Sequence, residues 1–123
     1  MARQADRVLV VDNLINGRRE NIEEVLSKQV MLHVTDIRDI ERMESLMKGA
    51  EVVFHLACLG VRHSIHSPRE NHDVTAAATL GLIEATKNCG VQHLDYLSSA
   101  DVSDTAGAKS SVQPGRGRLD FPR

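Results

Sequence analysis

The chain has 123 residues, of which 41% are apolar and 2% aromatic, and it carries a formal net charge of −2. This length fits one domain of ordinary size. The near-neutral charge and the scarcity of aromatic rings argue against electrostatic binding to nucleic acid or anionic membranes and against base stacking. No apolar run approaches the roughly 20 residues that span a bilayer, and the first residues lack the apolar stretch of a secretory signal. We therefore predict a cytoplasmic protein with no nucleic-acid or membrane partner.

Short apolar runs alternate with segments of helical spacing along the first hundred residues. The runs are rich in Val, Leu and Ile and predict buried strands, while the segments between them predict helices. Asp39 can cap one helix and Gly49 can end it, and Pro68 suits the first turn of another. The predicted strands are Arg7–Asp12, Val30–Val34, Glu51–Leu56 and His93–Leu97; the predicted helices are Glu20–Ser27, the segment after Asp39 and Ser67–Cys89, with a loop at Cys58–Ser67.

This β-α-β-α-β-α-β order predicts an α/β fold with a Rossmann-like parallel sheet covered by helices. The predicted domain spans residues 7–102. From about Ser103 the character of the sequence changes, because Gly and Pro become frequent and core residues become scarce. Residues 103–123 are therefore predicted to form a poorly ordered tail.

Two acidic residues stand at the ends of the first two predicted strands. In doubly wound nucleotide-binding folds, an acid in the position of Asp12 accepts hydrogen bonds from the adenosine ribose hydroxyls. That geometry selects NAD, because the carboxylate repels a 2′-phosphate. The alternative for Asp12 is a plain turn residue. Asp36 can meet the adenine edge; its alternative is helix capping, although Asp39 already serves that purpose.

Other polar side chains have simpler explanations. His55 lies within an apolar strand, where a histidine is more often structural than a catalytic base. His63, His66 and His72 are loosely spaced, and no carboxylate or thiolate completes a set, so no metal site is predicted. Ser99 ends the fourth predicted strand, where a hydroxyl can bond a substrate or simply form a turn.

Several stretches, taken in order, resemble the NAD-dependent sugar-nucleotide epimerase/dehydratase family of extended short-chain dehydrogenases/reductases, including UDP-glucose 4-epimerase-like proteins. The resemblance covers residues 7 to about 102, and its specificity comes from the ordered set, since no single motif is decisive. The matching stretches are Val8–Leu14 with Gly17–Asn21, Asp36–Asp39, Gly49–Ala57, Val61–Ile65 with Pro68, Thr79–Ala85 and Tyr96–Val102.

The resemblance implies bound NAD, which takes a hydride from the nucleotide-sugar substrate and returns it, while the protein supplies positioning. It also implies a homodimer for the complete protein. Asp12 and Asn13 would hold the adenosine ribose, and Asp36 and Ile37 would lie beside the adenine. Leu56 and Ala57 would lie beside the phosphates and the nicotinamide ribose. Ser99 would supply the catalytic hydroxyl.

The sequence departs from the family pattern at the groups that carry the chemistry. The family has a Gly-rich turn, GxxGxxG, that cradles the pyrophosphate, and a Tyr-x-x-x-Lys pair in which the tyrosine acts as the base. Neither motif occurs in this sequence. The only tyrosine, Tyr96, has no lysine four positions later, and Thr75 and Ala78 replace the family's usual Asn and Gly.

The resemblance also implies a strand order of 3-2-1-4-5, in which the usual first strand is central. This strand precedes the Gly-rich turn, and we expect the present sequence to lack both. The strands Arg7–Asp12 and Glu51–Leu56 would then each have an open apolar edge, which is an aggregation hazard. We therefore expect the chain to be poorly soluble or incompletely folded by itself.

From this resemblance we expect the chain to be a fragment, truncated at both ends, of an NAD-dependent epimerase/dehydratase acting on nucleotide-sugars, and we predict that it is inactive by itself. The alternative is a non-catalytic nucleotide-binding or regulatory remnant of that family. An unrelated α/β nucleotide-binding domain would require the family match to be chance. The sequence leaves the sugar open, as well as the choice between epimerisation, dehydration, decarboxylation and reduction.

Overall fold

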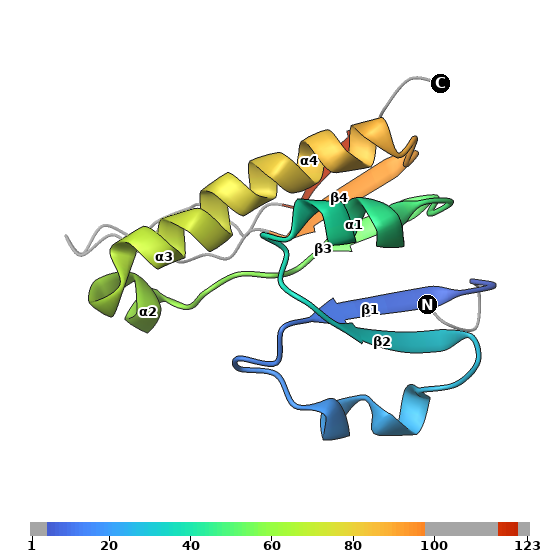
Figure 1. Ribbon diagram of the computed structural model, residues 1–123, viewed down its shortest axis with the longest axis horizontal. Helices are drawn as coiled ribbons and strands as arrows, with labels where there is room; N and C mark the ends of the chain where they lie inside the picture. The colour runs from blue at the N-terminus through green and yellow to red at the C-terminus, as the bar shows by residue number, and fades with distance from the viewer. Residues whose placement is uncertain (1–4, 98–115, 121–123) are drawn as a thin grey trace.

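The computed structural model describes residues 5–97 and 116–120 (Figure 1), and it has the α/β, Rossmann-like fold that the sequence predicts. Four strands, in the order expected, alternate with helical segments, and a fifth strand follows. The strands are β1 (Val8–Asp12), β2 (Val30–Val34), β3 (Val52–His55), β4 (His93–Leu97) and β5 (Arg116–Asp120). The α-helices are α1 (Ile40–Met47), α2 (Val61–His66), α3 (Pro68–His72) and α4 (Ala78–Asn88).

The strands form two sheets rather than one. Strand β1 pairs in parallel with β2, with Val8 opposite Val30, and β3 pairs in parallel with β4, with Val53 opposite Leu94. Strand β5 adds to β4 in the antiparallel sense. No described strand pairs with the other edge of β1 or of β3, so the two sheets are not joined by hydrogen bonds. The four parallel strands nevertheless run in the same direction (Figure 1).

One apolar cluster holds the two sheets together. Its buried members come from α1, from α4 and from the residue that follows α4's terminal turn: Met43, Met47, Leu82, Ala85 and Val91. Val11 of β1 and Val53 of β3 both pack against this cluster. Helix α1 therefore bridges two sheets that do not bond to each other, and apolar burial replaces the missing ladder of backbone hydrogen bonds.

The ends of α1 follow the chemistry that the sequence indicates. The carboxylate of Asp39 accepts a hydrogen bond of 3.1 Å from the backbone N–H of Arg42, which is the N-cap interaction. Met43 and Met47 lie four positions apart and are both buried, so they form the apolar face of the helix. Gly49 follows with φ +80°, a left-handed conformation that stops the helix at low steric cost.

The long helix predicted for Ser67–Cys89 is interrupted. Its first turn, α3, is followed by a π-helical turn at Asp73–Ala77, and α4 continues from there to Asn88. Helix α2 occupies most of the segment predicted to be a loop. It was not predicted because its six residues show no apolar periodicity. A lone turn of π-helix leaves no sequence pattern that separates it from an α-helix.

Two short 3-10 turns replace the helix predicted for Glu20–Ser27. They span Arg19–Asn21 and Glu23–Val25, and Ile22 between them departs from helical geometry at φ −121° and ψ 2°. Val25 is 56% exposed, so little packing supports the segment. Short helices depend on tertiary packing more than on propensity, and this segment receives too little of it. The prediction of a regular helix here was wrong.

Strand β5 lies within residues 103–123, for which the sequence predicts poor order. The strand was missed because Gly and Pro surround it and its own residues, Arg116–Asp120, have only one strongly apolar member. Pairing with β4, rather than intrinsic strand propensity, defines this segment. The remainder of the predicted tail lies outside the described residues, and the expected low solubility stays a prediction.

A glycine allows α1 and α4 to approach each other. A Cβ atom on Gly81 would lie 2.8 Å from Cδ1 of Ile40, which is closer than carbon atoms pack. In an open helix position, Gly→Ala would raise the free energy of unfolding by about 1 kcal/mol. We expect Gly81→Ala not to give this gain, because the new methyl group overpacks the contact with α1. Urea denaturation measures the change.

The matched background is Ile40→Val, which removes Cδ1. In that background Gly81→Ala should stabilise the chain, and the double-mutant cycle should give a coupling free energy above about 0.5 kcal/mol. Additive effects of the two substitutions would contradict the close packing of α1 on α4.

Candidate functional site

Asp12 stands at the carboxyl end of β1 and shapes the turn after it. Its Oδ1 accepts a hydrogen bond of 2.7 Å from the backbone N–H of Leu14, a residue with φ +58°. A Cβ atom on Gly17 would lie 2.9 Å from the Asp12 Oδ2 atom, so a larger residue there would require this carboxylate to shift. Asp12 itself is exposed.

Asn13 connects the ends of the first two strands. Its Nδ2 donates a hydrogen bond of 3.2 Å to Oδ2 of Asp36, and its Oδ1 accepts one of 3.1 Å from the N–H of Ile15. Residues 13 and 36 follow parallel neighbours, and the carboxyl ends of parallel strands meet at one edge of a sheet. The structure therefore brings together Asp12, Asn13 and Asp36, as the sequence predicts for the adenosine side of a nucleotide site.

Arg38 is the partner of Asp36 that the sequence analysis missed. Its Nε and Nη2 atoms donate to the two carboxylate oxygens at 2.9 and 2.8 Å, and its backbone N–H donates to Oδ1 at 2.9 Å. This two-pronged contact with the Arg38 guanidinium holds the pKa of the Asp36 carboxyl well below its usual range. A cation two residues after an acid in a turn was the available signal. Asp36 is therefore a fixed anion.

The remaining predicted cofactor residues differ in exposure. The side chain of Ile37 is buried at 9% and packs with Val74 and Ala78, so its backbone is what remains for contact with a ligand. Leu56 and Ala57 follow the carboxyl end of β3, and both are exposed. They lie at the same end of the parallel strands as Asp12. Ser99, the predicted catalytic hydroxyl, lies outside the described residues.

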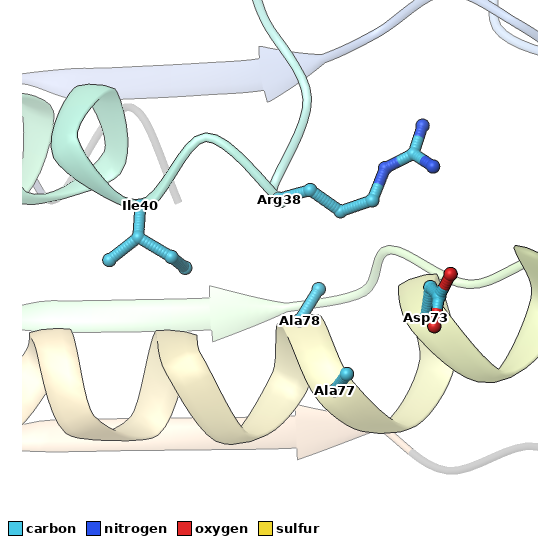
Figure 2. A pocket seen from close by; sticks show the side chains of 5 residues that line it. All are labelled: Arg38, Ile40, Asp73, Ala77 and Ala78. Atoms are coloured by element: carbon cyan, nitrogen blue, oxygen red, sulfur yellow. The ribbon is translucent and has the colours of Figure 1, made fainter.

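A shallow pocket of about 320 Å³ opens between the start of α1 and the π-helical turn before α4. Figure 2 shows Arg38 extended toward the end of the pocket where Asp73 lies, with Ile40 at the other end and Ala77 and Ala78 between them on the facing helix. The lining residues are Arg38, Ile40, Asp73, Ala77 and Ala78. Arg38 also lies 3.8 Å from a carboxylate oxygen of Glu70 on α3, so this side chain ties the β2–α1 turn to the helical layer.

His55 is structural in its contacts, in line with the simpler interpretation of the sequence. It is 3% exposed, and its Nε2 lies 2.8 Å from the hydroxyl of Thr79, which donates its own hydrogen to the carbonyl of Thr75 at 2.7 Å. Because that hydroxyl hydrogen is used, Nε2 must carry the proton and donate. Burial lowers the pKa of His55, which favours the neutral ring. Its ring also lies against Tyr96.

The other histidines do not assemble into a metal site. His63 bonds Glu70 at 2.8 Å, and His72 lies 3.8 Å from Asp73. In the part of the chain that the structure describes, no group of three or more His, Cys, Asp or Glu side chains could hold a metal ion. Within the same residues, no helix has the length and apolar character needed to cross a bilayer.

Comparison with known proteins shows the family to which this chain belongs. Residues 2–121 match the sequence profile of the 3-beta hydroxysteroid dehydrogenase/isomerase family. The chain belongs to this family. It is 30% identical over 108 residues to a UDP-glucose 4-epimerase of Erwinia amylovora, covering 83% of this chain and 32% of that enzyme. Over 80 residues it is 34% identical to 3beta-hydroxysteroid-dehydrogenase/decarboxylase isoform 2 of Arabidopsis thaliana, covering 65% and 14%.

A solved relative shares the fold of this family member. The structure is a UDP-glucose-4-epimerase from Stenotrophomonas maltophila with bound NAD and formylated UDP-arabinopyranose. It has a TM-score of 0.73 and 28% identity, covering 92% of this chain and 36% of the other. The resemblance to NAD-dependent epimerases and dehydratases is thereby confirmed. The chain spans about a third of the length of the epimerases it matches.

The buried His55 makes a testable contribution to stability. Its pKa in the folded chain lies below the ordinary value of 6.5, so below that pH the unfolded chain binds more protons. The free energy of unfolding should therefore fall as the pH drops through 6.5 toward the lowered pKa, by at most about 1.4 kcal/mol per pH unit.

His55→Gln keeps an amide that can donate to Thr79 but cannot titrate. Urea denaturation of both proteins between pH 7.5 and 5 should give a shallower pH dependence for the variant. All the other histidines are common to the two proteins, so equal slopes would show that His55 is not buried as a neutral group.

Proposed function

We propose that this chain provides the adenosine side of the NAD site of an epimerase or dehydratase that acts on nucleotide-sugars. The observation that carries the proposal is the hydrogen bond from Asn13 to Asp36, beside the exposed carboxylate of Asp12. It joins the polar ends of two parallel strands in a chain whose family is established. The NAD bound to the solved Stenotrophomonas maltophila relative supports the choice of cofactor.

The residues present fit an adenosine ribose. Asp12 presents one free carboxylate oxygen, and the missing Cβ of Gly17 leaves the space that this carboxylate occupies. A carboxylate there accepts hydrogen bonds from both ribose hydroxyls and repels a 2′-phosphate, which favours NAD over NADP. When bound, the nicotinamide would accept a hydride from the substrate. The protein's part is to hold the adenosine end at the carboxyl edge of β1 and β2.

This sequence lacks two motifs that carry the family's chemistry. The sequence has no GxxGxxG turn for the pyrophosphate and no Tyr-x-x-x-Lys pair for proton transfer. We therefore propose weak NAD binding and no turnover by the chain alone. Ser99 stays the proposed catalytic hydroxyl of the complete site, and Leu56 and Ala57 stay the proposed residues beside the phosphates.

A second substrate class has support from two findings. The family profile carries the description 3-beta hydroxysteroid dehydrogenase/isomerase, and the Arabidopsis thaliana relative is a 3beta-hydroxysteroid-dehydrogenase/decarboxylase. A 3-beta-hydroxysteroid is therefore the second candidate for the substrate of the complete protein. The nucleotide-sugar is favoured because the Erwinia amylovora epimerase aligns over a larger share of this chain.

Isothermal calorimetry with NAD and NADP tests the proposal. We expect NAD to bind with a dissociation constant of roughly 1 mM, since only the adenosine contacts are present, and NADP to bind more weakly. Asp12→Ala should weaken NAD binding by about tenfold or more, because it removes a charged hydrogen-bond acceptor, and should remove the preference for NAD.

The matched control is Glu41→Ala, which removes the same charge from the exposed side of α1. It should leave both affinities unchanged. An equal loss of NAD affinity in the two variants would show that Asp12 acts only through the net charge of the chain. Tighter binding of NADP than of NAD would contradict the assignment of Asp12 to the ribose. Tight binding of NAD without turnover of UDP-glucose would favour the non-catalytic nucleotide-binding alternative for the isolated chain, and no binding at all would favour a remnant without a ligand.

A further inference from the structure

The chain leaves β1 through a largely exposed connection that leads to the first 3-10 turn (Figure 1). This connection contains an asparagine followed by a glycine, Asn16-Gly17, and Asn16 is exposed. An asparagine side chain can react with the backbone nitrogen of the next residue, because attack of that nitrogen on Cγ closes a five-membered ring. Glycine hinders the attack least, since it has no Cβ and its backbone adopts more conformations than that of any other residue.

Hydrogen bonds fix the backbone on either side of this pair. Before the pair, the N–H of Ile15 donates to Oδ1 of Asn13 at 3.1 Å. After the pair, the carbonyl of Arg18 accepts a bond of 3.1 Å from an N–H of the 3-10 turn. Between these bonds, no described residue is hydrogen-bonded to the side chain of Asn16 or to the N–H of Gly17. Both reacting groups are therefore free to meet.

The other four asparagines, which also lie in the described part of the chain, lack this combination. None of them precedes a glycine: they are Asn13, Asn21, Asn71 and Asn88. The side chains of the first and third are held by hydrogen bonds of 3.2 Å to Asp36 and to the carbonyl of Leu59. The second and fourth are followed by N–H groups that donate to the carbonyls of Arg19 and Ala85, at 3.1 and 2.9 Å. We call these four the reference asparagines.

Gly17 lies directly against the carboxylate of Asp12. The space where its Cβ would stand is only 2.9 Å from Oδ2 and 3.0 Å from Oδ1 of Asp12. The same Oδ1 accepts the bond of 2.7 Å from the N–H of Leu14, whose φ of +58° is a strained conformation for a bulky residue. A displacement of Gly17 would therefore disturb the contact that keeps this turn in its strained form.

We propose that Asn16-Gly17 is a site of spontaneous backbone rearrangement that releases the turn around Asp12. The backbone nitrogen of Gly17 bonds to Cγ of Asn16, the Cγ–Nδ2 bond breaks, and Nδ2 leaves as ammonia with the proton from Gly17. Water then opens the five-membered ring. Opening at Cγ gives aspartate, and opening at the backbone carbonyl gives isoaspartate, in which the main chain runs through the side-chain carbon atoms. Water is the only reagent consumed, and nothing is oxidised or reduced.

The products change both the charge and the length of the connection. Each carries a new carboxylate next to Gly17, and isoaspartate also lengthens the main chain by a methylene group. The longer chain cannot keep both the bonded turn before residue 16 and the contact of Gly17 with Asp12. The hydrogen bond from Leu14 to Asp12 therefore opens. The rearrangement itself is independent of the nucleotide site, and only its effect on NAD rests on the function proposed above.

Ageing of the full 123-residue chain in slightly alkaline buffer, followed by peptide mapping with mass spectrometry, tests the reaction. Residue 16 should convert, with isoaspartate among the products, at least about tenfold faster than any reference asparagine, which corresponds to a barrier lower by about 1.4 kcal/mol. The matched variant is Asn16→Gln, which keeps a side-chain amide but must close a larger ring. Its residue 16 should stay intact over the same period.

Amide hydrogen exchange on the same samples tests the release of the turn. Ion exchange isolates the converted chain, which carries an additional negative charge. Exchange at Leu14 should be about tenfold faster in this chain, while exchange at Met43, whose N–H donates to Asp39 at 2.9 Å, should be unchanged. Aged Asn16→Gln should keep the original rate at Leu14. The converted chain should also bind NAD about tenfold more weakly, because the ribose acceptor is no longer held in place.

Three results would overturn the proposal. Conversion of residue 16 no faster than that of the reference asparagines would show that the pair has no special reactivity, and this comparison holds even if Asn16→Gln does not fold. Conversion with unchanged exchange at Leu14 would show that the turn does not depend on this linkage. Equal acceleration at Leu14 and Met43 would indicate general unfolding. Faster exchange at Leu14 alone with unchanged NAD affinity would support the rearrangement and contradict the assignment of Asp12 to the ribose.

Discussion

The packing of α1 and α4 on both sheets is the constraint on which this structure depends. Met43 and Met47 from α1 and Leu82 from α4 form a cluster that touches β1 through Val11 and β3 through Val53. No backbone ladder joins those strands in the described residues. The relative position of the two sheets therefore follows from side-chain packing, which is less directional than hydrogen bonding. Gly81 contributes to this packing, because a Cβ there would press on the Ile40 side chain.

The predicted nucleotide site inherits its geometry from this arrangement. Asp12, Asn13 and Asp36 are placed by the first sheet alone, since the pairing of β1 with β2 brings their carboxyl ends together. Leu56 and Ala57 follow β3 of the second sheet. Arg38 links the first sheet to the helical layer, because it bonds Asp36 after β2 and lies near Glu70 on α3. A ligand that contacts both sheets would therefore act across the same interface that the helical cluster maintains.

Sequence patterns predicted the elements whose causes are local. The four parallel strands are apolar runs, and the ends of α1 are set by Asp39 and by Gly49 in its left-handed conformation. The residues proposed to bind adenosine could be selected because the ends of such strands are recognisable in the sequence. Elements that depend on distant contacts were not predictable in the same way. Strand β5 exists through pairing with β4, and the 3-10 turns replace a helix that too little packing supports.

The site was predictable to a similar extent. Asp12 and Asp36 follow from their positions after strands, but the grip of Arg38 on Asp36 depends on a turn geometry that spacing alone does not specify. The burial of Ile37 beside Val74 likewise depends on where the π-helical turn places Val74 and the first residue of α4, Ala78. The family pattern supplied the proposed ligand, while the structure supplied the contacts that hold the proposed binding residues in place.

Amide hydrogen exchange along β1 and β3 tests most directly the claim that side-chain packing, rather than a backbone ladder, joins the two sheets. Residue-resolved exchange should alternate, with slow amides at Val10 and Val53, which face paired strands, and fast amides at Leu9, Val11, Val52 and Phe54. Uniform protection along both strands in the isolated chain would show that the edges of β1 and β3 that face away from β2 and β4 are already paired, and would contradict the account.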